Sequence, residues 1–339
     1  MKNVYIAASP LQLISAIEAR NRFKGNKHTF VVFLTNIPRQ TSFIEAIVKM
    51  FITEDEIIYV DYKNKLSSAI GKMNLLKRLQ KTRFDNAFVA HFAEFFMRLY
   101  ICNLNYKSLF LLDDGTATLV YNKQLTEKVT CVRCSIKLAF KGVTKYIFLL
   151  KNRFNIERKV EINWFTMFDF NPSNDNIYIR HKFEYLKSKY INSTSVTANN
   201  KVYFIGPGLV HDNIVKSNDI YIELVKKIRT QYSQFEFIYL PHRLENLDDL
   251  VILTRDTDIQ IVQFDNVLEV AFISNNIVPR HICSFYSTAL YSLKLLYPQC
   301  KIDFMEIDKD YVNTQYVEVV TTIEEYYKTL FNSIKKLSE

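Results

Sequence analysis

Strand-like and helix-like segments alternate along this chain in two separate series, and no other feature constrains the fold as strongly. In the first series, short apolar runs such as Asn3–Ala8 and Thr29–Leu34 precede segments with apolar residues at helical spacing, such as Ser42–Phe51 and Leu66–Gln80. Strands that are separated by helices usually pair in parallel. We therefore predict a parallel sheet with helices on both faces.

A second series begins at Lys201–Ile205 and ends in a helix that we predict over Thr322–Leu337. The polar stretch Asn192–Asn200, rich in small residues, suits a linker between the two series. We therefore predict an α/β chain with two Rossmann-like, doubly wound domains, over residues 1–195 and 196–339. Ligands bind at the carboxyl ends of the strands in such domains, so we expect a binding cleft between the two.

Composition restricts the choice of partners. The net charge of 44 − 35 = +9 favours an acidic partner, such as a sugar nucleotide, an anionic lipid or nucleic acid. The basic residues lack the interleaved aromatic and glycine pattern of an RNA-binding sheet, so we expect no nucleic-acid partner. We find no secretory signal pattern and no apolar run of spanning length, and five cysteines suit a reducing cytoplasm. The lone pair Cys131 and Cys134 is interpreted as two ordinary thiols.

Two acids and a glycine, Asp113-Asp114-Gly115, directly follow a predicted strand at Ser108–Leu112. The carboxyl end of a strand is where α/β sheets place their functional groups, which favours a catalytic acid. Asp and Gly are also favoured in turns, so a purely structural turn is the alternative. One acid can shape the turn while the other acts, and we assign the turn to Asp114 and Gly115 and the catalytic role to Asp113.

Three further polar segments follow predicted strands of the second series. Pro241-His242 offers a histidine that can bind a phosphate oxygen or protonate a leaving group, although a structural histidine fits equally well. Ser287-Thr288 opens a predicted helix, where hydroxyls and backbone N–H groups can hold a phosphate or serve only as an N-cap. The loop from Gly206 to Asp212 can carry a catalytic carboxylate, or its glycines can merely shape the loop.

These segments, taken in order, resemble bacterial glycosyltransferase family 52, the lipooligosaccharide and capsule sialyltransferases. The resemblance spans most of the chain and rests on segments in the following order: Leu11-Gln12, Asp113–Thr116, Gly206-Pro207, Pro241-His242, Glu269 and Phe285–Ala289. It implies a GT-B-like fold with the nucleotide-sugar donor on the C-terminal domain and the acceptor on the N-terminal one.

The resemblance also implies roles for individual residues. His242 would be the phosphate-binding histidine and general acid, Ser287 and Thr288 the phosphate-binding hydroxyls, and Glu269 a nucleoside-binding acid; Gly206 and Pro241 belong to the donor-binding segments. The usual His-Pro dipeptide is absent, since His242 is followed by Arg243. The catalytic acid of the Gly-Pro loop has no clear counterpart, so Asp113 and Asp212 stand as rival bases.

The implied reaction is inverting transfer of sialic acid, or a related nonulosonic acid, from CMP-sialic acid to a galactose-type hydroxyl of a bacterial surface glycan. We expect no cofactor and no metal, because a departing monophosphate needs less charge compensation than a diphosphate. A UDP-hexose-dependent transferase of the same family and a noncatalytic basic binding protein are the alternatives. We expect a cytoplasmic protein; a peripheral contact with the inner membrane and a homodimer are both compatible with the resemblance.

Overall fold

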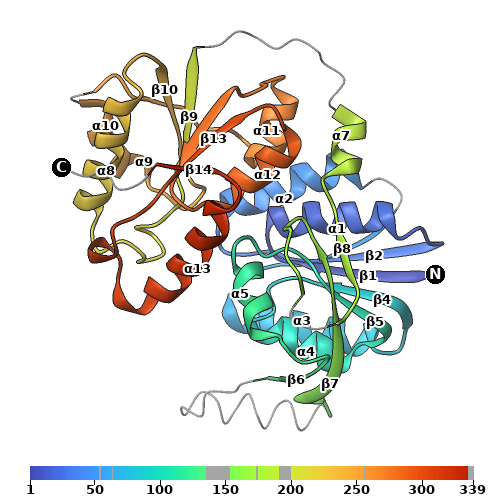
Figure 1. Ribbon diagram of the computed structural model, residues 1–339. Helices are drawn as coiled ribbons and strands as arrows, with labels where there is room; N and C mark the ends of the chain where they lie inside the picture. The colour runs from blue at the N-terminus through green and yellow to red at the C-terminus, as the bar shows by residue number, and fades with distance from the viewer. Residues whose placement is uncertain are drawn as a thin grey trace. The chain divides into compact units, whose positions relative to one another are not determined.

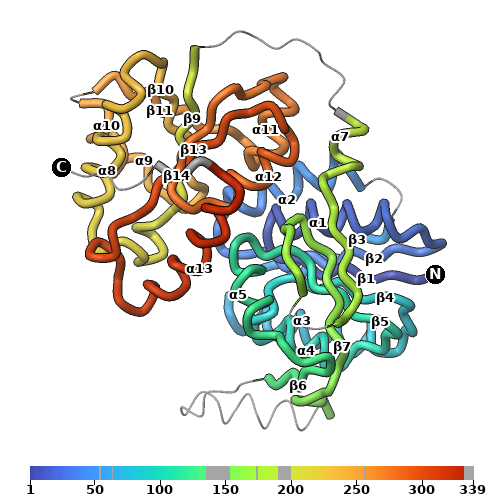
Figure 2. The backbone as a smooth tube through the Cα atoms, in the orientation of Figure 1, coloured from blue at the N-terminus to red at the C-terminus, as the bar shows by residue number. Residues whose placement is uncertain are grey.

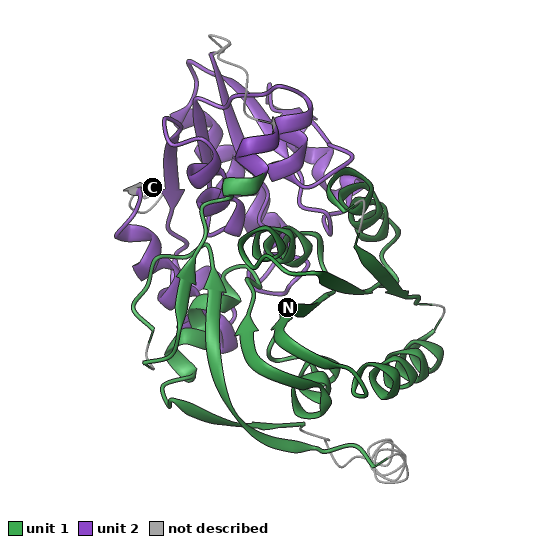
Figure 3. Ribbon diagram, turned by 90° about the vertical axis from the view of Figure 1, so that its right-hand side faces the viewer, with its two compact units in different colours: residues 1–185 green, residues 186–339 purple. Residues whose placement is uncertain are grey.

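A computed structural model of the chain describes residues 1–52, 55–62, 64–134, 153–172, 175–190, 200–255 and 257–334. It divides into two units, Met1–Tyr185 and Leu186–Glu339, which are coloured separately in Figure 3. The domain boundary that the sequence predicts at residue 195 lies outside the described residues. Each unit is considered by itself.

The described part of unit 1 forms an eight-stranded sheet in the order β3-β2-β1-β4-β5-β7-β6, with β8 also paired to β7. The strands are β1 (Lys2–Ala7), β2 (Lys27–Phe33), β3 (Glu56–Val60), β4 (Arg83–Val89), β5 (Asn105–Leu111), β6 (Val129–Arg133), β7 (Glu157–Thr166) and β8 (Tyr178–Arg180). The helices are α1 (Pro10–Arg22), α2 (Pro38–Phe51), α3 (Lys65–Leu79), α4 (Phe95–Asn103) and α5 (Ala117–Gln124), and α7 (Glu184–Tyr190) begins at the end of unit 1 and continues into unit 2. Among these strands β6 runs antiparallel to its neighbour β7, and the other pairs are parallel.

Side chains of the central strand β1 point alternately to two apolar layers. Val4 and Ile6 join a buried cluster that includes Leu76 of α3 and Met97 of α4. Tyr5 points to the opposite face, where its ring stacks between those of Phe30 and Phe88. Figure 1 shows α1 and α2 on one side of this sheet and α3 and α4 on the other. The predicted parallel sheet with two covered faces is thus confirmed for unit 1.

The described part of unit 2 forms a six-stranded parallel sheet in the order β11-β10-β9-β12-β13-β14. Its strands are β9 (Lys201–Ile205), β10 (Glu236–Leu240), β11 (Gln260–Ile261), β12 (His281–Ser284), β13 (Lys301–Met305) and β14 (Asn332–Ile334). Its α-helices are α8 (Asn218–Gln231), α9 (Leu247–Leu250), α10 (Ile252–Arg255), α11 (Leu268–Ser274), α12 (Thr288–Leu296) and α13 (Val317–Lys328). In Figure 2, α8 and α10 lie on one side of β9, and α11 and α12 lie on the other.

This second sheet confirms the predicted pair of Rossmann-like sheets, and the overall fold class is GT-B-like. The prediction of one helix over Thr322–Leu337 is wrong. The helix α13 ends at Lys328, and Asn332–Ile334 pairs in parallel with β13. Pairing along β13 satisfies backbone hydrogen-bonding groups of both segments, and such tertiary pairing outweighs a local helical pattern. Among the described residues, no helix is long and apolar enough to cross a bilayer.

A buried carboxylate at Asp303 joins several polar groups of unit 2. Its Oδ2 atom lies 2.5 Å from Nε2 of His281 and accepts a hydrogen bond from the Tyr232 hydroxyl at 2.8 Å. The ammonium group of Lys301 lies 3.2 Å from the same oxygen. Burial alone would raise the pKa of Asp303, but the hydrogen bonds from His281 and Tyr232 prevail and the pKa is lowered.

We expect Asp303→Asn to lower the free energy of unfolding by about 3 kcal/mol at pH 7, because it breaks a buried pair. The folded-state pKa lies below the ordinary value of about 4, so the stabilisation is complete above that pH and is lost as pH falls through the folded-state pKa. Urea unfolding of both proteins from pH 7 to pH 3 measures the difference, with the exposed Asp265→Asn as control. A difference that stays constant down to pH 3 would contradict a role for the ionised carboxylate.

Candidate functional site

Three neighbouring strands of unit 2 end in the segments that the sequence marks as functional. The strands lie side by side in the order β10-β9-β12 and run parallel, so their carboxyl ends share one edge of the sheet. Pro241-His242 follows β10, the Gly206–Gly208 loop follows β9, and Phe285–Ser287 follows β12. The structure therefore brings the donor-side candidates to one sheet edge, as expected for a doubly wound fold.

The imidazole of His242 packs directly against the loop that follows β9. Gly208 has a φ of 71°, a backbone conformation that favours glycine, and a Cβ atom at this position would lie 2.6 Å from Nδ1 of His242. The N–H of Leu244 points at the same nitrogen at 3.4 Å. In a neutral ring Nδ1 is therefore the acceptor and Nε2 carries the proton.

The carboxylate of Glu245 lies beneath these two loops, and the sequence reasoning missed it. Its Oε2 atom accepts a hydrogen bond from the backbone N–H of His242 at 2.7 Å, and its Oε1 atom accepts one from the Tyr239 hydroxyl at 3.0 Å. The Tyr239 hydroxyl lies 2.7 Å from that of Tyr221. Glutamate at this position resembles an ordinary surface charge in the sequence Leu244-Glu245-Asn246, so no local signal identifies it.

Ser287 is the N-cap of α12. Its Oγ atom accepts a hydrogen bond from the backbone N–H of Ala289 at 3.3 Å, and its carbonyl accepts one from the Tyr327 hydroxyl at 2.8 Å. A capping serine still has its hydroxyl hydrogen to donate. The capping role that the sequence offers as the alternative is thus present, and the part of Ser287 and Thr288 in binding phosphate stays a prediction.

Glu269 is buried within α11 and contacts α12. The hydroxyl of Ser292 donates a hydrogen bond to its Oε1 atom at 2.5 Å. Burial raises the pKa of Glu269, and the hydrogen bond from Ser292 and the charge of Arg243 oppose that rise. The carboxyl group therefore lies close to the helix that carries the phosphate-binding candidates, and its part in nucleoside binding stays a prediction.

Asp212 lies on the exposed turn at the end of the loop after β9. Half of its side chain is exposed, and its Oδ1 atom lies 3.1 Å from Nδ1 of His211. Its backbone N–H donates a hydrogen bond to the carbonyl of Gly208 at 3.1 Å, which connects it to the same loop that covers His242. This carboxylate is accessible to solvent and to a substrate.

In unit 1, the two adjacent acids after β5 have different surroundings. Asp113 is only 1% exposed. Its carboxylate accepts hydrogen bonds from Thr166 Oγ1 at 2.5 Å and the N–H of Met167 at 3.0 Å, and it lies 2.9 Å from Nε2 of His181. A fourth hydrogen bond comes from Ser15 Oγ at 3.2 Å. These contacts tie the end of β5 to β7, β8 and α1, which is a structural role.

Asp114, by contrast, is partly exposed. Its Oδ1 atom accepts a hydrogen bond from the side-chain amide of Gln12 at 2.6 Å, and its Oδ2 atom accepts one from the Tyr121 hydroxyl at 3.1 Å. The amide oxygen of Gln12 in turn accepts the N–H of Ala8 at 2.8 Å, so the Gln12 amide is fixed in this orientation. Gly115 has a φ of 62°, as the predicted turn requires.

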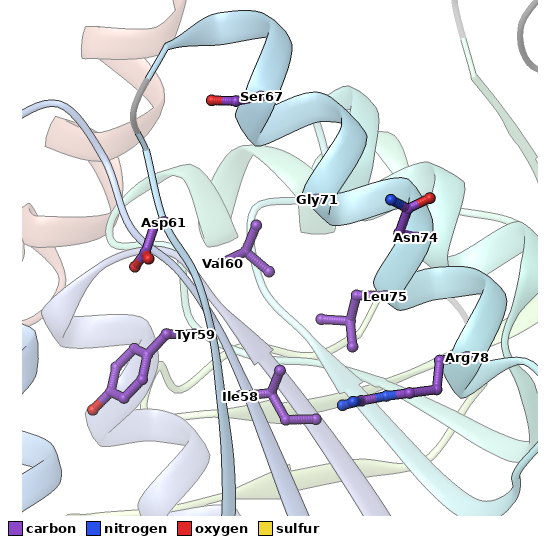
Figure 4. A pocket seen from close by; sticks show the side chains of 9 residues that line it. All are labelled: Ile58, Tyr59, Val60, Asp61, Ser67, Gly71, Asn74, Leu75 and Arg78. Carbon is purple, nitrogen blue, oxygen red and sulfur yellow. The ribbon is translucent and has the colours of Figure 1, made fainter.

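A separate cavity of about 510 Å³ lies in unit 1 between β3 and α3 (Figure 4). Its floor is formed by Ile58, Val60 and Leu75, and its rim carries Asp61 and Arg78. None of the predicted site residues lines it. Elsewhere in the described residues, no cluster of His, Cys, Asp or Glu could hold a metal ion, and Cys131 and Cys134 are free thiols.

The chain matches no protein-family model, and no curated protein matches its sequence. Solved structures share its fold. A co-structure of Staphylococcus aureus MnaA with UDP aligns at TM-score 0.53 and 11% identity over 97% of this chain and 87% of that one. UDP-GlcNAc 2-epimerase from Neisseria meningitidis, bound to UDP-GlcNAc, aligns at TM-score 0.51 and 10% identity over 98% and 95%.

An α/β-galactoside α-2,3-sialyltransferase from the luminous marine bacterium Photobacterium phosphoreum aligns at TM-score 0.49 and 12% identity, over 98% of both chains. At identities of 10% and 11%, the two alignments with TM-scores above 0.5 show the fold alone.

Proposed function

We propose that this chain is an inverting glycosyltransferase that transfers sialic acid, or a related nonulosonic acid, from CMP-sialic acid to a galactose-type hydroxyl of a bacterial surface glycan. The observation that carries the proposal is the meeting of His242, the glycine loop after β9 and the Ser287-capped start of α12 at one edge of unit 2. The resemblance to glycosyltransferase family 52, in segment order along most of the chain, supports the choice of donor.

The groups at this edge suit a departing phosphate. The Nε2–H of His242 donates a hydrogen bond to a phosphate oxygen, and in its protonated form the ring also neutralises the developing charge. The hydroxyls of Ser287 and Thr288 and the first backbone N–H groups of α12 bind the remaining oxygens. Such fixed donors stabilise the leaving CMP more than the intact donor sugar, because negative charge grows on the phosphate as the glycosidic bond breaks.

A carboxylate must accept the proton of the acceptor hydroxyl as the new bond forms. Asp113 and Asp212 are the rivals that the sequence predicts, but the four hydrogen bonds to buried Asp113 leave it little capacity to accept a proton. We assign the base to Asp114, because it is partly exposed and its carboxylate is oriented by Gln12 and Tyr121. Asp212 remains the rival, since it is accessible but has fewer contacts that fix its position.

A UDP-sugar donor is the second candidate. Two solved structures with this fold are described with UDP and UDP-GlcNAc, which is the reason to test a uridine nucleotide beside CMP. A diphosphate leaving group carries more charge, so it demands more compensation than the single phosphate of CMP.

His242→Ala is expected to reduce CMP release from CMP-sialic acid, with lactose as acceptor, by a factor of 100 or more, since general acid–base groups typically contribute about 10²–10⁴-fold. His211→Ala, which changes an exposed histidine of the same unit, is the matched control and should retain activity. Full activity of the His242 variant would contradict the proposal. If charge reversal at Lys226 and Lys227 then abolished every measurable function, the noncatalytic basic binding protein would be the better description.

Asn substitutions separate the three candidate bases. We expect Asp114→Asn to lower kcat by about 100-fold or more while CMP still binds, because a base acts on the acceptor and not on the nucleotide. Asp212→Asn should change kcat less than tenfold, and Asp113→Asn should mainly lower the melting temperature. A larger loss of kcat in the Asp212 variant than in the Asp114 variant would transfer the assignment to Asp212.

Thermal shift distinguishes the two donor classes, because a ligand that binds the folded state raises its melting temperature. We expect CMP to raise the melting temperature more than UDP at equal concentration, and transfer to continue in excess EDTA. A shift with UDP but not with CMP would favour the UDP-hexose reaction. Activity that returns only with added magnesium or manganese would contradict metal independence.

A further inference from the structure

We propose that Glu245 is a positioning residue that holds the loops after β9 and β10 in the arrangement that receives the donor phosphate. The identity of the ligand rests on the proposed function, but the positioning of the two loops by Glu245 does not. Glu245 is not among the residues to which the family resemblance gives a role, and it is separated from the phosphate-binding groups by the backbone it supports.

The carboxylate contacts both loops. It accepts a hydrogen bond from the backbone N–H of His242 at 2.7 Å, and its Oε2 atom lies against Gly206 at the start of the loop after β9. The backbone of Gly208 in the same loop also helps to lower the pKa of this carboxyl group. One carboxylate therefore lies between the two loops, and a rotation of the loop after β10 would break a charge-assisted hydrogen bond.

The glycine at position 206 provides an independent sign that the loop closes on Glu245. A Cβ atom there would lie 2.8 Å from the Tyr239 hydroxyl and would also collide with Oε2 of Glu245. A larger side chain here would have to displace the Glu245 carboxylate, and with it the hydrogen bond to His242. Gly206 therefore permits the close approach of the β9 loop to the carboxylate.

The groups that face Glu245 within the described residues are neutral donors and not cations. Tyr239 comes from β10, Tyr221 from α8, and the N–H groups from the two loops. Burial raises the pKa of Glu245, and these hydrogen bonds only partly oppose the rise. Since no ion pair is involved, a neutral amide can reproduce the arrangement: its oxygen accepts the N–H of His242, and its NH₂ donates to Tyr239 while Tyr239 donates to Tyr221.

This predicts different results for two substitutions of Glu245. Glu245→Met fills the same volume but removes the acceptors, so the loops lose their common anchor. Glu245→Gln keeps an acceptor for His242 and should rescue binding. Tyr239→Phe, which removes one donor and keeps the ring, should fall between the two. Asp303→Asn, the loss of another buried acid of unit 2, is the control for general destabilisation.

The test compares the affinities of CMP and cytidine by calorimetry. In Glu245→Met we expect the Kd of CMP to rise at least tenfold and that of cytidine to stay within a factor of two, because the loops hold the phosphate and not the base. Glu245→Gln should raise the Kd of CMP by less than threefold, and Asp303→Asn should change neither ligand. Equal weakening of CMP and cytidine, or unchanged CMP binding in Glu245→Met, would overturn the proposal.

A second readout needs no ligand. The ring signals of His242 are identified in the NMR spectrum of the full chain by their loss in His242→Ala. We expect them to shift in Glu245→Met and to stay in place in Glu245→Gln.

If the wild type binds UDP and not CMP, the proposed donor is wrong, and UDP and uridine replace CMP and cytidine in the same comparison. If no nucleotide binds, the proposed function fails, and unmoved His242 signals in Glu245→Met would refute the positioning role as well.

Discussion

Parallel backbone pairing of β9 with β10 on one side and with β12 on the other is the interaction on which the donor site depends. Tyr203 is paired with Ile238 in one neighbour and with Ile282 in the other, so the three strands run in the same direction and end together. The loops that follow them become neighbours although they are far apart in the sequence. Strand pairing therefore brings the side chains of these loops together, and no single continuous sequence motif has to contain them all.

Each unit also has a hydrogen-bonded carboxylate beside its functional candidates: Asp113 is buried and Glu245 is partly buried. Asp113 ties the end of β5 to Thr166 and His181, and its neighbour Asp114 remains partly exposed. Glu245 ties together two loop backbones and leaves the ring of His242 partly exposed. A buried charge is tolerated only where donors surround it, so these acids hold the loop geometry rigidly and the adjacent side chains are available for chemistry.

The sequence was sufficient for the fold class because periodicity and alternation are local properties. The predicted strand Lys201–Ile205 coincides with β9, and a helix begins at Ser287-Thr288 as predicted, since both segments have a clear apolar pattern next to polar turns. The strand at Asn332–Ile334 was missed because its pairing with β13 is set by a distant segment. The same limitation applies to antiparallel β6, whose partner β7 lies well beyond it in the sequence.

The site was less predictable for the same physical reason. Asp113 and Asp114 are indistinguishable in the sequence, and which of them is buried is decided by Thr166 and His181, far along the chain. Tyr239, whose hydroxyl donates a hydrogen bond to Glu245, resembles an ordinary core residue of a strand in the sequence. Patterns along the chain thus identify which segments lie at the sheet edge. Which of two adjacent polar residues is buried and which is exposed depends on contacts between segments.

The chemistry of the donor edge bears on the choice between the proposed donors. The candidate groups that meet there include a histidine, two hydroxyls and the N–H groups at the start of α12, which are neutral donors when the histidine is unprotonated. Arg243, which directly follows His242, adds a positive charge that acts on Glu269. Neutral donors match the modest charge of a departing monophosphate, whereas a diphosphate gains more from a cation held against it. Although the chain carries a net charge of +9, the positive charge is scattered along the sequence. In the proposed function the donor is held by directed hydrogen bonds, for which the loop positions must be accurate, and a hydrogen-bonded anchor such as Glu245 would fix those positions.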